Sequence, residues 1–138
     1  MWKLLTQPEV WLRQDELSEQ LSPAIDVDGK RTVDGVMEAL LCGDFALFEI
    51  NMKSVNVLMV VEIGHTPENA KCLWIIYLAG RIGLGPKAWL AGVRSHVSLL
   101  MGVAKSMNCT EMRLEGRNWS RVLPWWERLN GNELRQML

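Results

Sequence analysis

The stretch Lys71–Lys87 reads KCLWIIYLAGRIGLGPK and decides the fold. Its first part, through Leu78, has the apolar, β-branched and aromatic content of a strand. Three glycines follow at short intervals: Gly80, Gly83 and Gly85. Pro86 comes next and suits the first turn of a helix. The stretch therefore predicts a strand, a glycine-rich turn and a helix start.

The glycine-rich turn is a candidate anion site. Glycines let a ligand approach backbone N–H groups, and a helix start presents unpaired donors with a partial positive charge. Arg81 and Lys87 would add full positive charges. The combination suits a pyrophosphate, and the alternative is a tight turn that needs glycine only for its conformation.

Downstream, a helix is predicted from about Pro86 to Met107, with Asn108 as its left-handed cap. Its apolar stripe recurs at helical spacing and comprises Leu90, Val93, Val97, Leu100, Met101 and Ala104. His96 falls on the polar side, so we expect it at the surface. Thr110 to Arg117 alternates as a strand, and a strand after a crossover helix should lie parallel to the preceding strand.

The last residues predict a helical turn from Trp119 to Leu123 and then a hairpin. Asn130-Gly131 is a strong hairpin signal, and it separates strand candidates at Trp126 to Leu129 and Glu133 to Met137. The alternative is a helix from Pro124 to Leu129 that Asn130-Gly131 caps.

Upstream of the deciding stretch, the first 30 residues predict one helix and a loop. We expect the helix from Gln7 to Leu21, where the Ser22-Pro23 pair stops it. An acidic loop should follow through Asp26, Asp28 and Gly29.

A second helix from Thr32 to Gly43-Asp44 and two further strands are predicted before Lys71. The strands run from Phe45 to Met52 and from Val55 to Ile63, with short connections that favour an antiparallel meander. Both faces of the Val55–Ile63 strand are largely apolar, which is typical of a central strand covered by helices.

Length and composition favour one domain over residues 1–138, with 1–31 as an N-terminal helical extension. The chain is 49% hydrophobic and 22% charged, which argues against disorder and against a coiled coil. No apolar run could span a bilayer and no signal peptide is recognisable, so we expect no membrane contact and a location in the cytoplasm.

Cysteine and histidine counts exclude the common metal and disulfide patterns. Cys42, Cys72 and Cys109 form no CxxC pair, and with His65 and His96 they assemble no metal site of recognisable spacing. Cys109 follows a helix end, where no positive field would lower its pKa, so we do not expect a nucleophile.

Charge and tryptophan content bear on partners. Residues 1–85 carry 7 basic and 12 acidic groups, a net −5, whereas residues 86–138 carry 8 and 4, a net +4. Seven tryptophans in so short a chain indicate that some lie at a partner surface.

From about Thr32 onward, the order of predicted elements resembles the Gcn5-related N-acetyltransferase (GNAT) fold. The stretch AKSMNCTEMRL (Ala104–Leu114) is similar to the family's passage from the long helix into the next strand. Leu78-Ala79-Gly80 and EGRNWSRVL (Glu115–Leu123) resemble small GNAT-like proteins of tailed bacteriophages. The resemblance implies a mixed α/β fold: a central sheet with an antiparallel meander and a parallel crossover, and helices on both faces.

The resemblance also implies a cofactor site for acetyl-coenzyme A. In the family, amides of the glycine-rich turn hold the pyrophosphate, and the splay between two central parallel strands admits the pantetheine arm. The residues that match are Leu78, Gly80, Arg81, Gly83, Gly85, Lys87 and Asn118.

The catalytic candidates are Glu115 and Tyr77. Glu115 is the favoured general base, and Glu62 is the less favoured alternative. Family members often use a tyrosine after the short helix to protonate the leaving thiolate, but that place holds Pro124-Trp125-Trp126 and the chain's one tyrosine is Tyr77.

Three functions are compatible with these residues. The first is a non-catalytic GNAT-like protein of a phage virion or its assembly, or a binder of a host protein, located in the host cytoplasm and incorporated in the virion. The second is an acetyl-CoA-dependent N-acyltransferase acting on an amine. The third, and least favoured, is a nucleic-acid module that uses a set of arginines and tryptophans: Arg113, Arg117, Arg121, Arg128, Trp119, Trp125 and Trp126.

Overall fold

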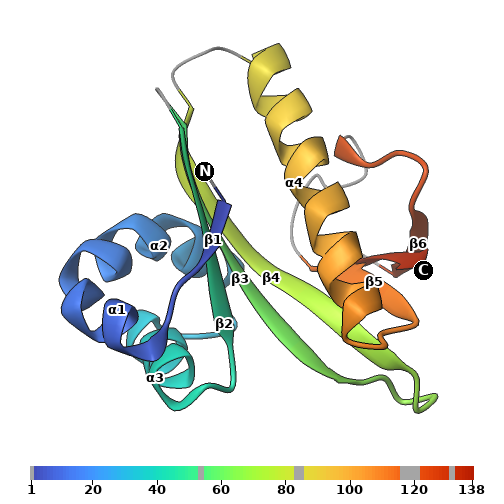
Figure 1. The fold of residues 1–138 in the computed structure, drawn as a ribbon, viewed down its shortest axis with the longest axis horizontal. Coiled ribbons are helices and arrows are strands. Elements are labelled where there is room, and N and C mark those ends of the chain that lie inside the picture. The colour runs from blue at the N-terminus through green and yellow to red at the C-terminus, as the bar shows by residue number, and fades with distance from the viewer. Residues whose placement is uncertain (1, 53–54, 83–85, 116–121, 131–132) are drawn as a thin grey trace. The chain divides into compact units, whose positions relative to one another are not determined.

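The computed structural model describes residues 2–52, 55–82, 86–115, 122–130 and 133–138. Its helices are α1 (Gln7–Leu12), α2 (Gln14–Asp28), α3 (Val33–Cys42) and α4 (Pro86–Ser106). Its strands are β1 (Trp2–Leu4), β2 (Ala46–Met52), β3 (Val55–His65), β4 (Lys71–Ile82), β5 (Glu111–Leu114), β6 (Glu127–Asn130) and β7 (Glu133–Met137). Figure 1 shows these elements coloured along the chain.

The described strands form one seven-stranded mixed sheet in the order β1-β2-β3-β4-β5-β7-β6. β4 and β5 pair in parallel, whereas β1–β2, β2–β3, β5–β7 and β6–β7 pair antiparallel. The predicted meander with one parallel crossover is therefore confirmed, and so is the mixed α/β class.

Two compact units make up the chain, and each is described by itself. The first consists of Met1–Glu62 and Tyr77–Gly83, and the second of Ile63–Ile76 and Leu84–Leu138. The β3–β4 hairpin contributes residues to both.

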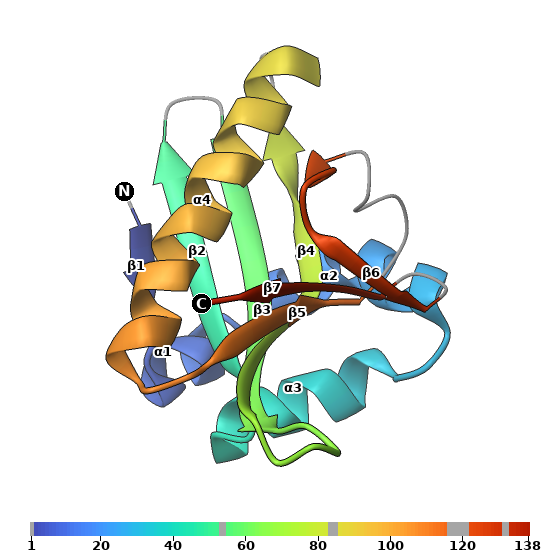
Figure 2. The same ribbon diagram turned by 90° about the vertical axis from the view of Figure 1, so that its right-hand side faces the viewer.

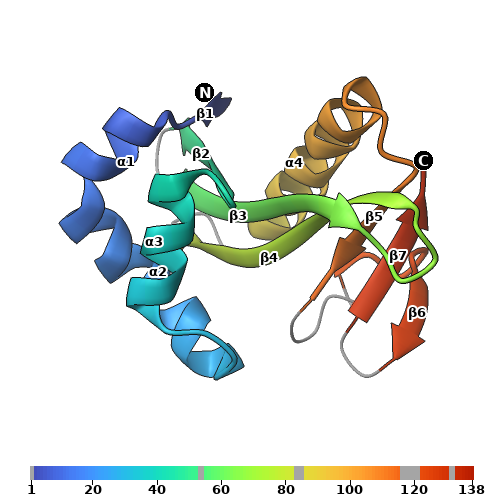
Figure 3. The same ribbon diagram turned by 90° about the horizontal axis from the view of Figure 1, so that it is seen from below.

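In the first unit, α1, α2 and α3 lie on one side of β2 and β3 (Figure 3). The predicted second helix is confirmed as α3: the Thr32 side chain caps its N-terminus and Gly43, with φ 88°, ends it. β3 is confirmed as a strand covered on both faces, since every residue from 57 to 61 is buried.

The first helix differs from its prediction. The single helix predicted from Gln7 to Leu21 is divided at Arg13 into α1 and α2. Pro23 lies inside α2, which continues through Asp26 to its αL cap at Gly29. Asp26 and Asp28, which were expected in an acidic loop, are thus helical, and Gly29 follows the helix. Proline removes one helical hydrogen bond, at a cost of about 3 kcal/mol, but Leu21 and Ile25 on either side of it are fully buried. Burial of two such side chains stabilises by roughly 1.5–3 kcal/mol each, which offsets the loss.

Arg13, between α1 and α2, connects these helices to the sheet through an ion pair. Its guanidinium donates to both carboxylate oxygens of Glu49 on β2, at 2.8 and 2.7 Å. Glu49 is 7% exposed, and the hydrogen bonds from Arg13 lower its pKa. No sequence pattern indicated this pair, and none indicated β1, which adds an edge strand beside β2.

In the second unit, β5, β7 and β6 lie side by side (Figure 2). The terminal hairpin is confirmed, and the alternative helix from Pro124 to Leu129 is wrong because Glu127–Asn130 is strand β6. Asn130 pairs with Glu133, so the turn itself falls outside the described residues. The predicted helical turn from Trp119 to Leu123 also lies mostly outside them.

The long helix is confirmed as α4, and Asn108 adopts the predicted left-handed conformation, with φ 63°. The Lys71 ammonium on β4 donates a hydrogen bond to the Met107 carbonyl, just after the end of α4, at 2.7 Å. None of the helices in the described ranges combines the length and apolarity that a bilayer-spanning segment requires.

Candidate functional site

The parallel β4–β5 pair is the feature that the proposed acyl-transfer site requires. Cys72, Leu73, Trp74 and Ile75 lie opposite Glu111, Met112, Arg113 and Leu114. The Glu115 N–H then donates to the Ile75 carbonyl at 3.3 Å. β5 ends at Leu114, whereas β4 continues to Ile82. The predicted parallel neighbour after the crossover helix is therefore in place.

β4 extends further than predicted, to Ile82. Leu78, Gly80 and Arg81 all lie on β4, so the structure brings these three cofactor candidates together on one strand. A Cβ at Gly80 would lie 2.2 Å from the Asn56 carbonyl oxygen of β3. Gly80 thus allows two strands to approach closely, which explains why it extends the strand instead of turning the chain.

The other cofactor candidates are Lys87, Gly83, Gly85 and Asn118. Lys87 lies in the first turn of α4, a turn without an acidic residue, so the helix start keeps its positive character. Gly83, Gly85 and Asn118 lie outside the described residues.

Tyr77 is buried in the first unit, at 4% exposure, and Arg31 lies against it. The Arg31 guanidinium is 5.8 Å from the Tyr77 ring centre and 5.7 Å from that of Phe45, and it donates to the Tyr77 hydroxyl at 3.4 Å. Arginine has only donors, so the phenol oxygen is the acceptor in this contact. Sequence reasoning missed Arg31, because a lone arginine between two helices has no distinguishing pattern.

Glu115 and Glu62, the two general-base candidates, are both half-buried. Glu115 belongs to the second unit and directly follows β5, whereas Glu62 belongs to the first unit and lies on β3. A half-buried carboxylate keeps enough access to solvent to exchange protons, which is what a general base requires.

Arg113 is buried in an ion cluster. Its guanidinium contacts carboxylates of Glu111 at 2.9 Å, Glu133 at 3.3 Å and Glu68 at 3.6 Å. Arg113 is 9% exposed, and Trp126 is 5% exposed. Neither can hold a phosphate or stack a base as the nucleic-acid hypothesis required, so that part of the hypothesis is wrong. Arg117, Arg121 and Trp119 lie outside the described residues.

Among the tryptophans whose side chains the structure describes, two are exposed, as their number led us to expect. Trp11 is 60% exposed and Trp125 is 59% exposed. The Arg94 guanidinium lies 5.1 Å from the Trp125 ring centre and donates to the Val122 carbonyl at 2.8 Å. These contacts hold Trp125 in place at the surface of the second unit.

His96 is not the surface residue that its position on the helix predicted. It is 8% exposed, its Nδ1 has no hydrogen-bond partner among the described residues, and burial lowers its pKa. The helical face that buries Val93, Val97 and Leu100 extends further round α4 than the sequence pattern indicated.

The thiols divide by exposure. Burial raises the pKa of Cys72 to about 12 and raises that of Cys109, so neither suits a thiolate nucleophile. Cys42 is exposed. Across the described ranges, no three His, Cys, Asp or Glu side chains gather in a way that could hold a metal ion.

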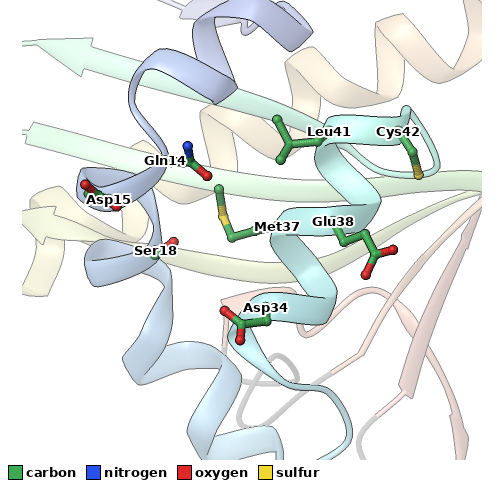
Figure 4. Close-up of a pocket in the computed structure, with 8 residues that line it drawn as sticks. All are labelled: Gln14, Asp15, Ser18, Asp34, Met37, Glu38, Leu41 and Cys42. Carbon is green, nitrogen blue, oxygen red and sulfur yellow. The ribbon is translucent and has the colours of Figure 1, made fainter.

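A groove of about 490 Å³ lies in the first unit, between α2 and α3 (Figure 4). Its lining comprises Gln14, Asp15, Ser18, Asp34, Met37, Glu38, Leu41 and Cys42. No cofactor or catalytic candidate lines it. The groove is therefore a separate feature, which the sequence did not indicate.

Comparison with known proteins gives structural neighbours alone. No protein-family model and no curated protein sequence matches the chain. Among solved structures, the AtaT–AtaR complex bound to DNA matches with a TM-score of 0.66 and 12% identity, over 99% of this chain and 93% of that one. AtaTR bound with acetyl-CoA matches with a TM-score of 0.62 and 11% identity, over 99% of this chain and 92% of that one. AtaT complexed with acetyl-methionyl-tRNAfMet matches with a TM-score of 0.57 and 11% identity, over 99% of this chain and 94% of that one.

These neighbours support the GNAT-like fold that the sequence resemblance implied, since AtaT is a GNAT-fold toxin. At such low identity the likeness shows the fold and leaves function to be argued from residues.

Proposed function

We propose that this protein is an acetyl-CoA-dependent N-acyltransferase that acts on an amine. The observation that carries the proposal is the parallel β4–β5 pair after the crossover helix α4, with the glycine-rich segment following β4. The fold match to AtaT over 99% of the chain, including a complex with acetyl-CoA, supports it.

In the proposed reaction, acetyl-CoA supplies a thioester, and the amine nitrogen attacks its carbonyl carbon. A C–N bond forms, the C–S bond breaks, and the amine loses a proton while the departing thiolate gains one. Glu115 is the proposed base. Tyr77, whose hydroxyl oxygen accepts a hydrogen bond from Arg31, is the proposed acid.

The proposed cofactor residues are those of the glycine-rich segment and its surroundings: Leu78, Gly80, Arg81, Gly83, Gly85, Lys87 and Asn118. Lys87 brings a cation to the first turn of α4, where there is no acid to repel a phosphate.

The complex of AtaT with acetyl-methionyl-tRNAfMet suggests which amine to test first. We propose the α-amino group of an aminoacyl-tRNA as the acceptor. An antitoxin bound to AtaT likewise makes a protein partner the natural expectation here.

Calorimetry with acetyl-CoA tests cofactor binding. We expect micromolar affinity, and a loss of at least tenfold on Gly83→Trp, because the indole would obstruct the backbone amides. Gly102→Trp is the matched control: Gly102 is exposed on α4, with nothing within 4 Å of its added Cβ. No binding at millimolar acetyl-CoA would refute the proposal.

A non-catalytic binding role is the second candidate. It rests on the exposed Trp11 and Trp125 and on the Pro124-Trp125-Trp126 sequence where the family's usual tyrosine is expected. The phage origin, the virion location and the host protein partner stay predictions. Detection of the protein in purified virions, together with no response to acetyl-CoA, would favour this role over catalysis.

A further inference from the structure

The groove between α2 and α3 is negatively charged and has no cation of its own. Asp15 comes from α2, and Asp34 and Glu38 come from α3, one helical turn apart. All three are exposed. Within the described residues none of them has a hydrogen-bond or ion-pair partner, and none of the eight lining residues is Lys or Arg. Like charges one turn apart on a helix repel, so a cationic partner would stabilise this surface.

The groove also has an apolar floor. Met37 is 6% exposed, and Figure 4 shows it extending from α3 toward Gln14 and Ser18 of α2. Leu41 is half-buried beside it. Methionine adapts its shape to different apolar groups and is frequent at protein-binding surfaces.

Large apolar side chains are also exposed at the end of α1, which Arg13 separates from the groove residue Gln14. Trp11 is 60% exposed and Leu12 is 81% exposed. Exposed tryptophans are the side chains most often found at the centre of protein interfaces. The first unit thus presents carboxylates together with exposed apolar side chains.

These properties exclude most classes of ligand. Three carboxylates repel phosphates, which argues against nucleic acid and against an anionic membrane surface. The lining carboxylates do not form a metal-binding cluster in the described structure. A neutral apolar molecule would not neutralise the carboxylate charges. The remaining class carries positive charge and apolar groups on one molecule.

We propose that this groove binds a basic, amphipathic segment of another protein, with an apolar side chain over Met37 and Leu41 and Lys or Arg opposite the carboxylates. The recognition mode is an amphipathic segment laid into a groove. The inference is independent of the proposed acyl transfer, because no proposed cofactor or catalytic residue lines the groove.

A fluorescein-labelled synthetic helix of about four turns, with leucine on one face and lysine on the other, is the probe. We expect micromolar binding that weakens as salt is added. Two control peptides replace lysine by glutamate or leucine by serine. Equal binding of either control would overturn the proposal, because the groove requires both charge and apolar contact.

Charge-neutralising variants locate the site. Asp34→Asn combined with Glu38→Gln should weaken peptide binding at least tenfold. Glu19→Gln combined with Asp44→Asn removes the same charge from exposed positions outside the groove and should change binding less than twofold. Equal losses in the two double variants would show nonspecific attraction and would sink the proposal. Acetyl-CoA affinity should be the same in both, which separates this test from that of the proposed function.

Cys42 supplies a readout that needs no variant. It lines the groove and is exposed, whereas Cys72 and Cys109 are buried. A thiol reagent such as DTNB should therefore modify Cys42 first, and saturating lysine–leucine peptide should slow that reaction severalfold. An unchanged rate at saturating peptide would place the peptide elsewhere and contradict the proposal.

Discussion

Individual residues differ in how far their roles could be predicted. Thr32 and Asn108 cap helices as their types indicated, because capping depends on local backbone geometry. His96 and Arg113 were misjudged, because their burial depends on what packs against their element. Alternation and helical spacing show which side chains share a face, but do not show whether that face meets solvent.

Arg113→Ala should lower the free energy of unfolding by about 3–5 kcal/mol, because it leaves Glu111, at 3% exposure, as a buried charge without its partner. Urea denaturation measures the change. Arg135→Ala is the control, since it breaks the Arg135–Glu127 pair, in which Glu127 is 56% exposed. That loss should stay below about 1 kcal/mol. Equal losses would contradict the account of the cluster.

His96 should make stability depend on pH. Burial lowers its pKa in the folded state below the ordinary 6.5, so the unfolded chain binds the extra proton first. Stability is therefore full above pH 6.5 and should fall as the pH drops below it. Urea denaturation between pH 7.5 and about 5 should show that the free energy of unfolding decreases as the pH falls. His96→Phe should remove this dependence, and His65→Gln, at an exposed histidine, should leave it unchanged. A slope unaffected by His96→Phe would refute this assignment.

Elements were predicted well where apolar periodicity is long and badly where tertiary contact overrides a local signal. α3, α4 and the strands β2 to β7 were expected within a few residues of their bounds. α2 continues through Pro23 because Leu17, Leu21 and Ile25 form one buried stripe. β4 continues through Gly80 because the glycine faces the β3 backbone. β1 is too short to show a strand pattern and is defined only by its pairing with β2.

Pro23→Ala should raise the free energy of unfolding by about 1–2 kcal/mol, because a regained helical hydrogen bond outweighs the added freedom of the unfolded chain. Thermal and urea unfolding would measure it. Pro8→Ala is the matched control: Pro8 is also exposed but lies in the first turn of α1, where proline costs no hydrogen bond. A gain at Pro8 as large as that at Pro23 would contradict this explanation.

For the whole molecule, the antiparallel meander and the parallel crossover were predicted from the sequence, because connection rules restrict the topologies open to such a pattern. The buried ion pairs and the α2–α3 groove did not follow, because they join residues far apart in sequence. The cofactor site was predicted by resemblance, and the parallel strand pair that it requires is present as β4 and β5.

We predict that the chain unfolds as one domain, because β3 and β4 contribute residues to both compact units and neither unit can lose those strands alone. Differential scanning calorimetry should give a single transition whose calorimetric and van't Hoff enthalpies agree. Two resolved transitions would instead identify two independent folding units.

Acetyl transfer from radiolabelled acetyl-CoA to an aminoacyl-tRNA is the measurement that tests the proposed activity most directly. The account predicts protein-dependent label on the α-amino group, with matching release of coenzyme A, and a loss of at least a hundredfold in rate on Glu115→Gln. Label transfer no faster than in the absence of protein, to aminoacyl-tRNA and to a panel of small amines alike, would contradict it.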